Sequence, residues 1–181
     1  MIRFSIVVLF VFMSVTFGAV ADKLTYDVEK VEYKNLVANI YLPRVQSKVP
    51  AVIAFGGSEG GIDAGNANGE MLAPHGIAVL ALAFFNEKGL PSTLDQIPLE
   101  YFIKAIDYLS AHPAVDASRI GIVGGSRGSE AVFLVSSIDD RIKSVVATTP
   151  SNVAWYGLTK PVSAWMLNGK EIPAMSLALD S

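Results

Sequence analysis

The chain has 181 residues, 51% of them hydrophobic, a formal net charge of −3 and no cysteine. This length is enough for one domain with a substantial core, and the lack of cysteine excludes disulfides, a thiolate nucleophile and cysteine zinc ligands. The mildly acidic balance, without a basic stripe, argues against nucleic acid and anionic membrane surfaces as partners.

The first 21 residues have the features of a secretory signal peptide. Arg3 is followed by an uncharged apolar run over residues 4–17, and Ala19 and Ala21 form a cleavage site of small residues. The alternative is an uncleaved membrane anchor, but the apolar run is short for a bilayer span of about 20 residues. We therefore expect cleavage after Ala21, a secreted or periplasmic mature chain that begins at Asp22, and no stable membrane span after cleavage.

The remaining chain alternates short apolar runs with helical patterns. Two short strands at residues 24–31 and 36–42 predict an antiparallel hairpin. Buried strands are predicted at 51–55, 77–83, 120–124 and 142–147, and helices at 68–74, 98–111 and 127–137. Buried strands alternating with helices predict an α/β fold with a mostly parallel sheet and helices on both faces. After Pro150 no period is evident.

Residues 124–128 read Gly-Gly-Ser-Arg-Gly, a G-x-S-x-G motif between a predicted strand and a predicted helix. This is the context of the nucleophile elbow of α/β-hydrolases, where a serine occupies a strained strand-to-helix turn. Gly124 and Gly128 avoid collisions with the neighbouring backbone, and the helix N-terminus directs the Arg127 amide at a developing oxyanion. The alternative, a tight or phosphate-binding turn, lacks the lysine of a phosphate loop. We predict that Ser126 is the nucleophile and that the Arg127 amide stabilises the oxyanion.

A second glycine-rich segment, residues 56–61, follows the predicted strand at 51–55. Enzymes with a nucleophile elbow take their second oxyanion donor from a loop in this position. The amide of Gly57 or Ser58 is the candidate donor. The alternative is a flexible loop without a catalytic role, and the elbow further along the chain favours the catalytic interpretation.

The two histidines of the sequence, His75 and His112, both precede Ser126. In this fold the catalytic residues follow the order serine, acid, histidine, so neither histidine is in the right place to be the general base. Each stands at the end of a predicted helix, where an imidazole cap is ordinary.

The other charged groups near the motif have structural explanations. Arg127 and Glu130 are spaced to form an ion pair across one helical turn. Residues 139–141, Asp-Asp-Arg, are typical of a turn. No cluster of His, Asp and Glu has the spacing of metal ligands, so no metal or other cofactor is expected.

Several stretches together resemble the C-terminal domain of the acyl-CoA thioesterase and bile-acid-CoA:amino-acid N-acyltransferase family. They are residues 81–86 (ALAFFN), 89–91 (GLP), 99–102 (LEYF), 112–113 (HP), 120–130 with the motif, and 149–157. The resemblance covers about residues 51–173. It implies cleavage of an acyl thioester or ester through an acyl-enzyme, and serine rather than cysteine at the elbow resembles the hydrolase members. It also implies that the catalytic acid and histidine follow in a C-terminal portion.

No histidine follows Ser126 in the sequence. A serine without an imidazole in reach keeps its proton near neutral pH and is a poor nucleophile. We therefore expect residues 22–181 to be an incomplete α/β-hydrolase domain, inactive by itself, whose parent is a serine hydrolase of acyl thioesters or carboxylic esters. A dienelactone-hydrolase-like carboxylesterase is one alternative. The other is a pseudoenzyme or binding protein that keeps the pocket and has lost the base.

Overall fold

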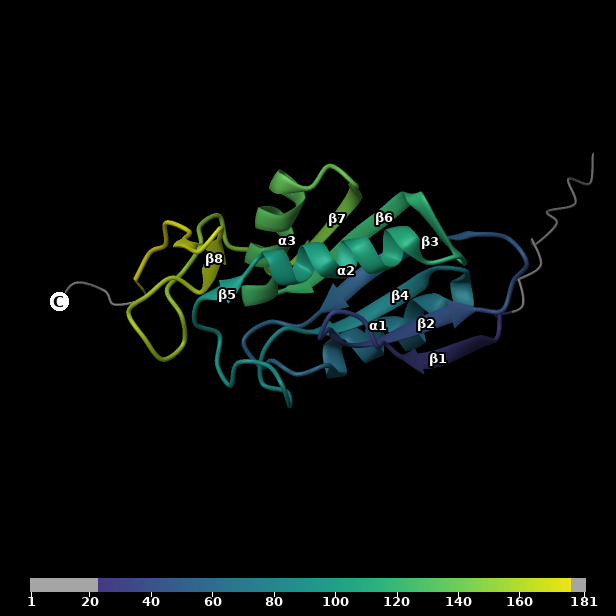
Figure 1. Ribbon diagram of the computed structural model, residues 1–181, viewed down its shortest axis with the longest axis horizontal. Helices are drawn as coiled ribbons and strands as arrows, with labels where there is room; N and C mark the ends of the chain where they lie inside the picture. Colours follow the sequence, from purple (N-terminus) through teal and green to yellow (C-terminus); the bar gives the residue numbers. More distant parts are fainter. Residues whose placement is uncertain (1–22, 177–181) are drawn as a thin grey trace, which may run out of the picture.

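The computed structural model describes residues 23–176, so the predicted signal peptide lies outside the described residues. Six strands form a mixed sheet in the order β1-β2-β4-β3-β6-β7 (Figure 1). Their bounds are β1 Tyr26–Lys30, β2 Val37–Pro43, β3 Val49–Phe55, β4 Ala78–Ala83, β6 Val115–Gly125 and β7 Ile142–Thr148. The predicted hairpin is confirmed as β1 and β2, and β2 pairs antiparallel with β4. The other four strands are parallel, as predicted.

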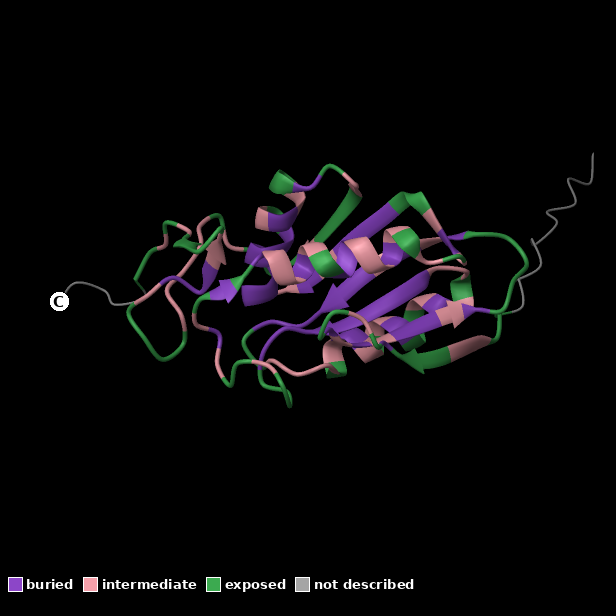
Figure 2. Ribbon diagram, viewed as in Figure 1, coloured by how far each residue is buried: buried purple, intermediate pink, exposed green. Residues whose placement is uncertain are grey.

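Helices cover both faces of this sheet, as the α/β prediction requires. Helices α2 (Glu100–Ala111) and α3 (Arg127–Ile138) pack on one face, and α1 (Asp63–Leu72) packs on the other (Figure 1). Alternate residues of a strand point to opposite faces. Ile53 accordingly belongs to the core under α2 and α3, whereas Ala54 belongs to the core under α1. Figure 2 shows the central strands buried between these layers.

The first helix was predicted wrongly at its start. It begins at Asp63 and ends at Leu72, five residues ahead of the predicted 68–74, and a 3₁₀ turn (Ala73–His75) follows it. Glycines argue against a helix interior, but here they allow close packing on the sheet. A β-carbon at Gly65 would lie 2.7 Å from the Ala54 carbonyl oxygen, and one at Gly69 would lie 2.4 Å from the Tyr41 ring. Packing therefore overrides helix propensity.

Two further strand predictions need correction. Strand β6 begins at Val115 rather than at residue 120, since its first part continues beside β3 beyond a register shift. Strand β7 was predicted to be buried, but Val145 and Val146 are 40% and 53% exposed. The physical reason is position, because among residues 23–176 β7 pairs only with β6 and forms an edge of the sheet.

The segment after Pro150 forms a small layer at the carboxyl end of the sheet. Strands β8 (Trp165–Leu167) and β9 (Lys170–Glu171) pair there with β5 (Ile97–Pro98), so α2 begins after Pro98 rather than with it. The fully buried Trp165 ring lies 5.8 Å from the Phe84 ring and 6.2 Å from the Phe102 ring. This aromatic contact attaches the small layer to the main core.

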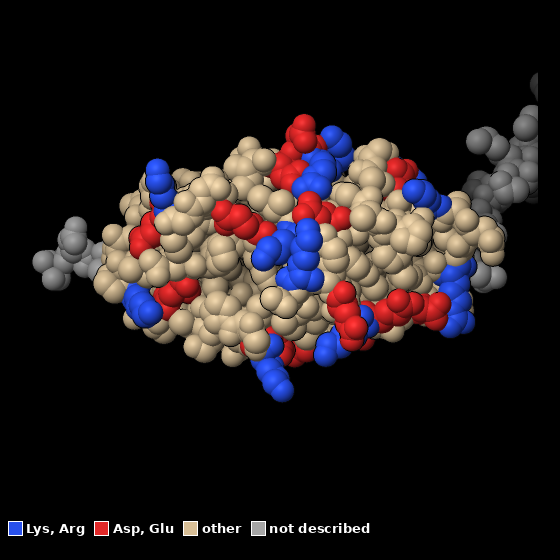
Figure 3. All heavy atoms as spheres, in the orientation of Figure 1, with Lys and Arg blue, Asp and Glu red and all other residues tan. Residues whose placement is uncertain are grey.

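In Figure 3, acidic and basic side chains are interspersed over the visible face rather than separated into patches. Within residues 23–176 no helix combines the length and the apolar character that a bilayer crossing requires.

Candidate active site

Ser126 lies at the sharp turn between β6 and α3. Strand β6 ends at Gly125 and α3 begins at Arg127, so Ser126 alone makes the connection. Its φ and ψ are 49° and −122°, a conformation that L side chains rarely adopt. Its amide donates a hydrogen bond to the Thr148 carbonyl at 2.9 Å, and its side chain is exposed. The predicted elbow therefore has the strained geometry that lifts a nucleophilic hydroxyl clear of the sheet.

The flanking glycines leave no room for a side chain. A β-carbon at Gly128 would lie 2.0 Å from the Gly56 carbonyl oxygen, and one at Gly124 would lie 2.7 Å from the Phe55 ring at the end of β3. Contacts below 3.0 Å are not tolerated by real β-carbons, so the elbow and the segment after β3 can approach only because these positions are glycine.

The second glycine-rich segment, residues 56–61, lies directly against the elbow, and we call it the β3 loop. A β-carbon at Gly57 would lie 2.9 Å from the Ser126 β-carbon and 3.3 Å from the Arg127 amide nitrogen. The structure thus brings Gly57, Ser126 and Arg127 together. Ser58, the other predicted oxyanion donor, is exposed and does not line the adjoining cavity.

A cavity of about 280 Å³ opens in front of Ser126. Its walls come from the ends of β3, β6 and β7, from the β3 loop and from α1. The lining residues are Phe55, Gly56, Gly57, Glu59, Ala64, Asn68, Val123, Gly124, Gly125, Ser126, Thr148 and Thr149. The site therefore occupies the carboxyl end of the parallel strands, where ligands of open α/β sheets bind.

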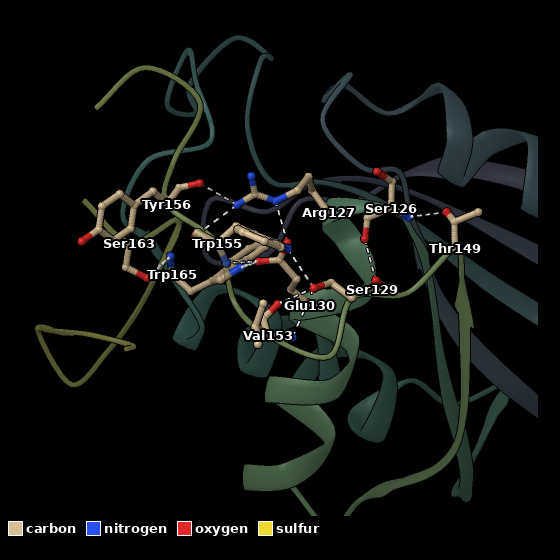
Figure 4. Close-up of polar contacts among 11 residues, drawn as sticks. Ser126, Arg127, Ser129, Glu130, Thr149, Val153, Trp155, Tyr156, Ser163 and Trp165 are labelled. Carbon is tan, nitrogen blue, oxygen red and sulfur yellow. Dashed lines mark hydrogen bonds and ion pairs between the residues drawn. The ribbon is translucent and has the colours of Figure 1, made fainter. Parts of the chain in front are cut away.

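The Arg127 side chain turns away from this cavity and forms a buried network with Glu130. Its Nε lies 2.6 Å from Glu130 Oε1, with side-chain exposures of 11% and 1%. Arg127 Nη2 also donates to the Tyr156 carbonyl at 2.8 Å, and the Trp165 indole donates to Glu130 Oε2 at 2.8 Å (Figure 4). The sequence predicted this pair as a structural contact, but nothing in it indicated that residues 155–165 are its other partners.

Neither histidine reaches Ser126. His75 precedes β4 and His112 precedes β6, so both lie at the amino end of the parallel strands, whereas Ser126 lies at the carboxyl end. At about 3.3 Å per strand residue, the six residues of β4 alone separate these ends by about 20 Å. Burial lowers the pKa of His112, although the nearby Glu29 carboxylate opposes that shift. The imidazole base of a triad is thus absent from the described part of the chain around Ser126.

The acidic segment at residues 139–141 forms the turn that the sequence predicts. Asp139, Asp140 and Arg141 form the turn between α3 and β7, and Arg141 Nη2 donates to Asp139 Oδ2 at 2.6 Å. This contact lowers the pKa of Asp139. Within residues 23–176, no group of three or more His, Asp or Glu side chains is arranged to hold a metal ion.

Comparison with known proteins shows which family the chain is similar to. Residues 97–164 match the family described as BAAT / Acyl-CoA thioester hydrolase C terminal. The family resemblance predicted from the sequence is therefore confirmed. The match spans α2, the elbow and α3, and it ends beside Trp165, whose indole binds Glu130.

Curated relatives extend the same similarity. The chain is 34% identical over 126 residues to acyl-coenzyme A amino acid N-acyltransferase 1 from Mus musculus, covering 70% of this chain and 29% of that protein. It is 35% identical over 143 residues to the mitochondrial acyl-coenzyme A thioesterase 2 from Rattus norvegicus, covering 79% and 30%. The chain thus spans about three tenths of the length of these relatives.

Solved structures agree on the fold. Hypothetical protein PA2218 from Pseudomonas aeruginosa superposes with a TM-score of 0.53 at 27% identity, covering 69% of this chain and 42% of that one. The α/β hydrolase GrgF from Penicillium sp. sh18 superposes with a TM-score of 0.56 at 18% identity, covering 68% and 45%. The α/β-hydrolase fold predicted from the sequence is confirmed.

Proposed function

We propose that the parent protein of this chain is a serine hydrolase that cleaves acyl thioesters or carboxylic esters through an acyl-enzyme on Ser126, with an imidazole base that residues 23–176 do not supply near the serine. The observation that carries this proposal is the strained backbone of Ser126, at a turn where Gly57, Gly124 and Gly128 leave no room for a β-carbon. Strain of this kind is stored at functional sites, since a purely structural turn at this position would be more stable with glycine.

In the proposed reaction the Ser126 oxygen attacks the carbonyl carbon, and the carbonyl oxygen becomes an oxyanion. The amides of Arg127 and Gly57 donate hydrogen bonds to that oxyanion. The carbon–sulfur or carbon–oxygen bond then breaks, and the leaving thiolate or alkoxide takes up the proton that the Ser126 hydroxyl gave up. Water hydrolyses the acyl-enzyme to the free acid and regenerates the serine hydroxyl. The acyl-coenzyme A thioesterases among the relatives support the thioester as substrate class.

Labelling with a fluorophosphonate probe tests this proposal. We expect the parent protein, in which an acid and a histidine complete the triad, to react at Ser126, and Ser126→Ala to abolish both labelling and hydrolysis of acyl thioesters while it keeps the fold. Ser58→Ala is the matched control, because Ser58 is an exposed serine in the adjacent loop and its replacement is expected to leave labelling unchanged. Turnover that survives in Ser126→Ala would overturn the proposal.

The second candidate is a pseudoenzyme that binds acyl compounds without cleaving them. It is favoured by the distance of both histidines from Ser126 within residues 23–176. An unactivated serine reacts slowly with fluorophosphonates. Labelling no faster than that of the denatured protein, together with retained binding of an acyl thioester, would select this alternative.

We propose in addition that residues 1–21 are a signal peptide and that the mature protein is secreted or periplasmic. The apolar run at 4–17 and the alanines at 19 and 21 support this. Expression of the gene with its native start, followed by N-terminal sequencing of the exported protein, is expected to give Asp22 as the first residue. An uncleaved, membrane-bound product would contradict it.

A further inference from the structure

The Gly57 amide, one of the two proposed oxyanion donors, is already occupied in this structure. It donates a hydrogen bond to Oε1 of Glu59 at 2.8 Å. Gly57 lies against Ser126, and Glu59 lines the same cavity as the serine. A carboxylate of the protein therefore holds the place that the oxygen of a substrate carbonyl would need.

Several hydrogen bonds hold the backbone of the β3 loop, whereas one holds the Glu59 side chain. The Glu59 carbonyl accepts a hydrogen bond from Asn86 Nδ2 at 3.1 Å, and the Gly61 amide donates to the Phe85 carbonyl at 3.0 Å. Gly60 and Gly61 adopt left-handed conformations with φ of 64° and 72°. The exposed Glu59 side chain, by contrast, makes its hydrogen bond in the described residues to Gly57 alone.

Gly56 creates the space that the carboxylate occupies. A β-carbon at Gly56 would lie 2.0 Å from Glu59 Oε1, so any other residue there would push the carboxylate away from the Gly57 amide. Carboxylates form strong hydrogen bonds with backbone amides, because the acceptor carries a full charge. A substrate must displace this contact before its own oxygen can be stabilised.

The surroundings of the β3 loop make a second negative charge unfavourable. Glu59 is the one charged side chain among the described residues that line the cavity. Two further carboxylates are near the loop: Asp63 opens α1, and Glu87 Oε1 would lie 3.7 Å from a β-carbon at Gly61. No lysine or arginine of the described chain lines the cavity to offset them.

We propose that Glu59 is a specificity-determining gate of the oxyanion site. In the resting protein the Glu59 carboxylate accepts the hydrogen bond of the Gly57 amide. The carbonyl oxygen of an uncharged acyl group displaces this carboxylate. An acyl group with a negative charge near the carbonyl is rejected. Because the displaced carboxylate stays on the same short loop, it remains at the cavity mouth and repels the second anion. This inference rests on the proposed hydrolase function for its kinetic consequences, whereas the gating contact itself can be tested without turnover.

The contact is tested by nuclear magnetic resonance on the Gly57 amide of the protein. As the solution is acidified through the range in which carboxyl groups take up protons, the Gly57 amide proton is expected to shift in the wild type and in Glu87→Gln, and to stay constant in Glu59→Gln. Modification of Ser126 by a fluorophosphonate, whose phosphoryl oxygen replaces the carboxylate, is expected to abolish the shift. A Gly57 signal that responds equally in wild type and Glu59→Gln would overturn the proposal.

The specificity is tested with two activated esters of equal chain length, one of a monocarboxylic acid and one a half-ester of a dicarboxylic acid. Glu59→Gln is expected to raise kcat/KM for the half-ester about tenfold relative to the neutral ester. The matched variant Glu87→Gln is expected to change this ratio much less, because Glu87 lies near the loop but does not line the cavity. An unchanged ratio in Glu59→Gln, with hydrolysis that still depends on Ser126, would overturn the gate and leave the hydrolase proposal standing. Absence of hydrolysis of both esters by the wild-type parent protein would instead count against the hydrolase, and the Gly57 signal would then decide the gate.

Discussion

The elbow and the β3 loop are both glycine-rich turns at the carboxyl end of the sheet, but their positive φ values fall on different kinds of residue. In the elbow the positive φ of 49° falls on Ser126, and the glycines on either side only make room. In the β3 loop the positive φ values fall on Gly60 and Gly61, which adopt them without strain.

The two segments also differ in how they are held. The elbow is followed by the buried pair of Arg127 and Glu130, with side-chain exposures of 11% and 1%. The β3 loop is held at its exposed side by a few hydrogen bonds, among them those of Asn86 and Glu59. The comparison teaches that the reactive residue is strained beside a buried ion pair, whereas the loop that supplies the second amide adopts its positive φ values without strain and is held by hydrogen bonds at its surface. Four experiments test this difference.

Breaking the support of the elbow is expected to have the largest effect. Arg127→Met leaves the Glu130 carboxylate buried and without its cation, which is expected to lower the free energy of unfolding by about 3–5 kcal/mol. Urea denaturation measures this. The double variant Arg127→Met/Glu130→Gln is expected to recover most of the loss, because no charge remains buried and the glutamine side-chain oxygen can still accept from the Trp165 indole. As a control, Arg119→Met removes an exposed ion pair with Asp116 and is expected to change the urea midpoint little. Equal effects of the two single substitutions would show that the buried pair does not support the elbow.

A substitution that pushes the elbow and the β3 loop apart is expected to have the second-largest effect on stability. Gly128→Ala places a β-carbon 2.0 Å from the Gly56 carbonyl oxygen and must push the β3 loop away from Ser126. We expect about 3 kcal/mol less stability in urea denaturation, together with loss of fluorophosphonate labelling. Gly89→Ala is the control: its positive φ of 90° is unfavourable for alanine, but nothing lies within 4 Å of its β-carbon. It is expected to cost about 1 kcal/mol and to keep labelling. Normal labelling in Gly128→Ala would refute the close approach.

The strain at Ser126 can be measured directly. Ser126→Ala keeps a β-carbon at φ 49°, whereas Ser126→Gly removes it. We expect the glycine variant to unfold at a higher urea concentration, with about 1 kcal/mol more stability than the alanine variant, because the flexibility of glycine in the unfolded chain offsets part of the relief. If the alanine variant is the more stable one, the elbow is not strained and the contrast with the β3 loop disappears.

Removal of the Asn86 hydrogen bond that holds the β3 loop is expected to have the smallest effect on stability. Asn86→Gly keeps the positive φ of 56° accessible and removes the hydrogen bond to the Glu59 carbonyl. Less than about 1 kcal/mol of stability is expected to be lost, but the Gly61 amide is expected to exchange its hydrogen faster with deuterium. Asn86→Ala adds strain and serves as the comparison. Unchanged exchange in both variants would mean that the loop is held by other contacts.

Much of the fold could be predicted because its signals are local. The antiparallel hairpin, the parallel strands at 51–55, 77–83 and 142–147, and α3 follow from apolar runs and turn residues that need no knowledge of distant neighbours. The predicted elbow at residues 124–128 has the expected turn geometry for the same reason, since strand, glycines and helix are contiguous. The family resemblance was legible in short motifs on these elements and is confirmed over 97–164.

Other features depend on partners that are far away in the sequence. The helix over Asp63–Leu72 contains glycines that a local reading penalises, and only the approach of Ala54 and Tyr41 explains them. The exposure of Val145 and Val146 follows from the place of β7 in the strand order, which its apolar sequence does not contain.

By itself the sequence determined the alternation of strands and helices, the strained serine at residue 126 and the absence of any histidine after it, because each is written in neighbouring residues or in composition. Only the tertiary structure decided that Gly57 rather than Ser58 faces the serine, that Glu59 occupies its amide, and that residues 155–165 close around Arg127 and Glu130. Apart from the Glu59 contact, which lies within one loop, these contacts join segments tens of residues apart. Their geometry is set by how the sheet and its loops pack, not by the order of residues in any one of them.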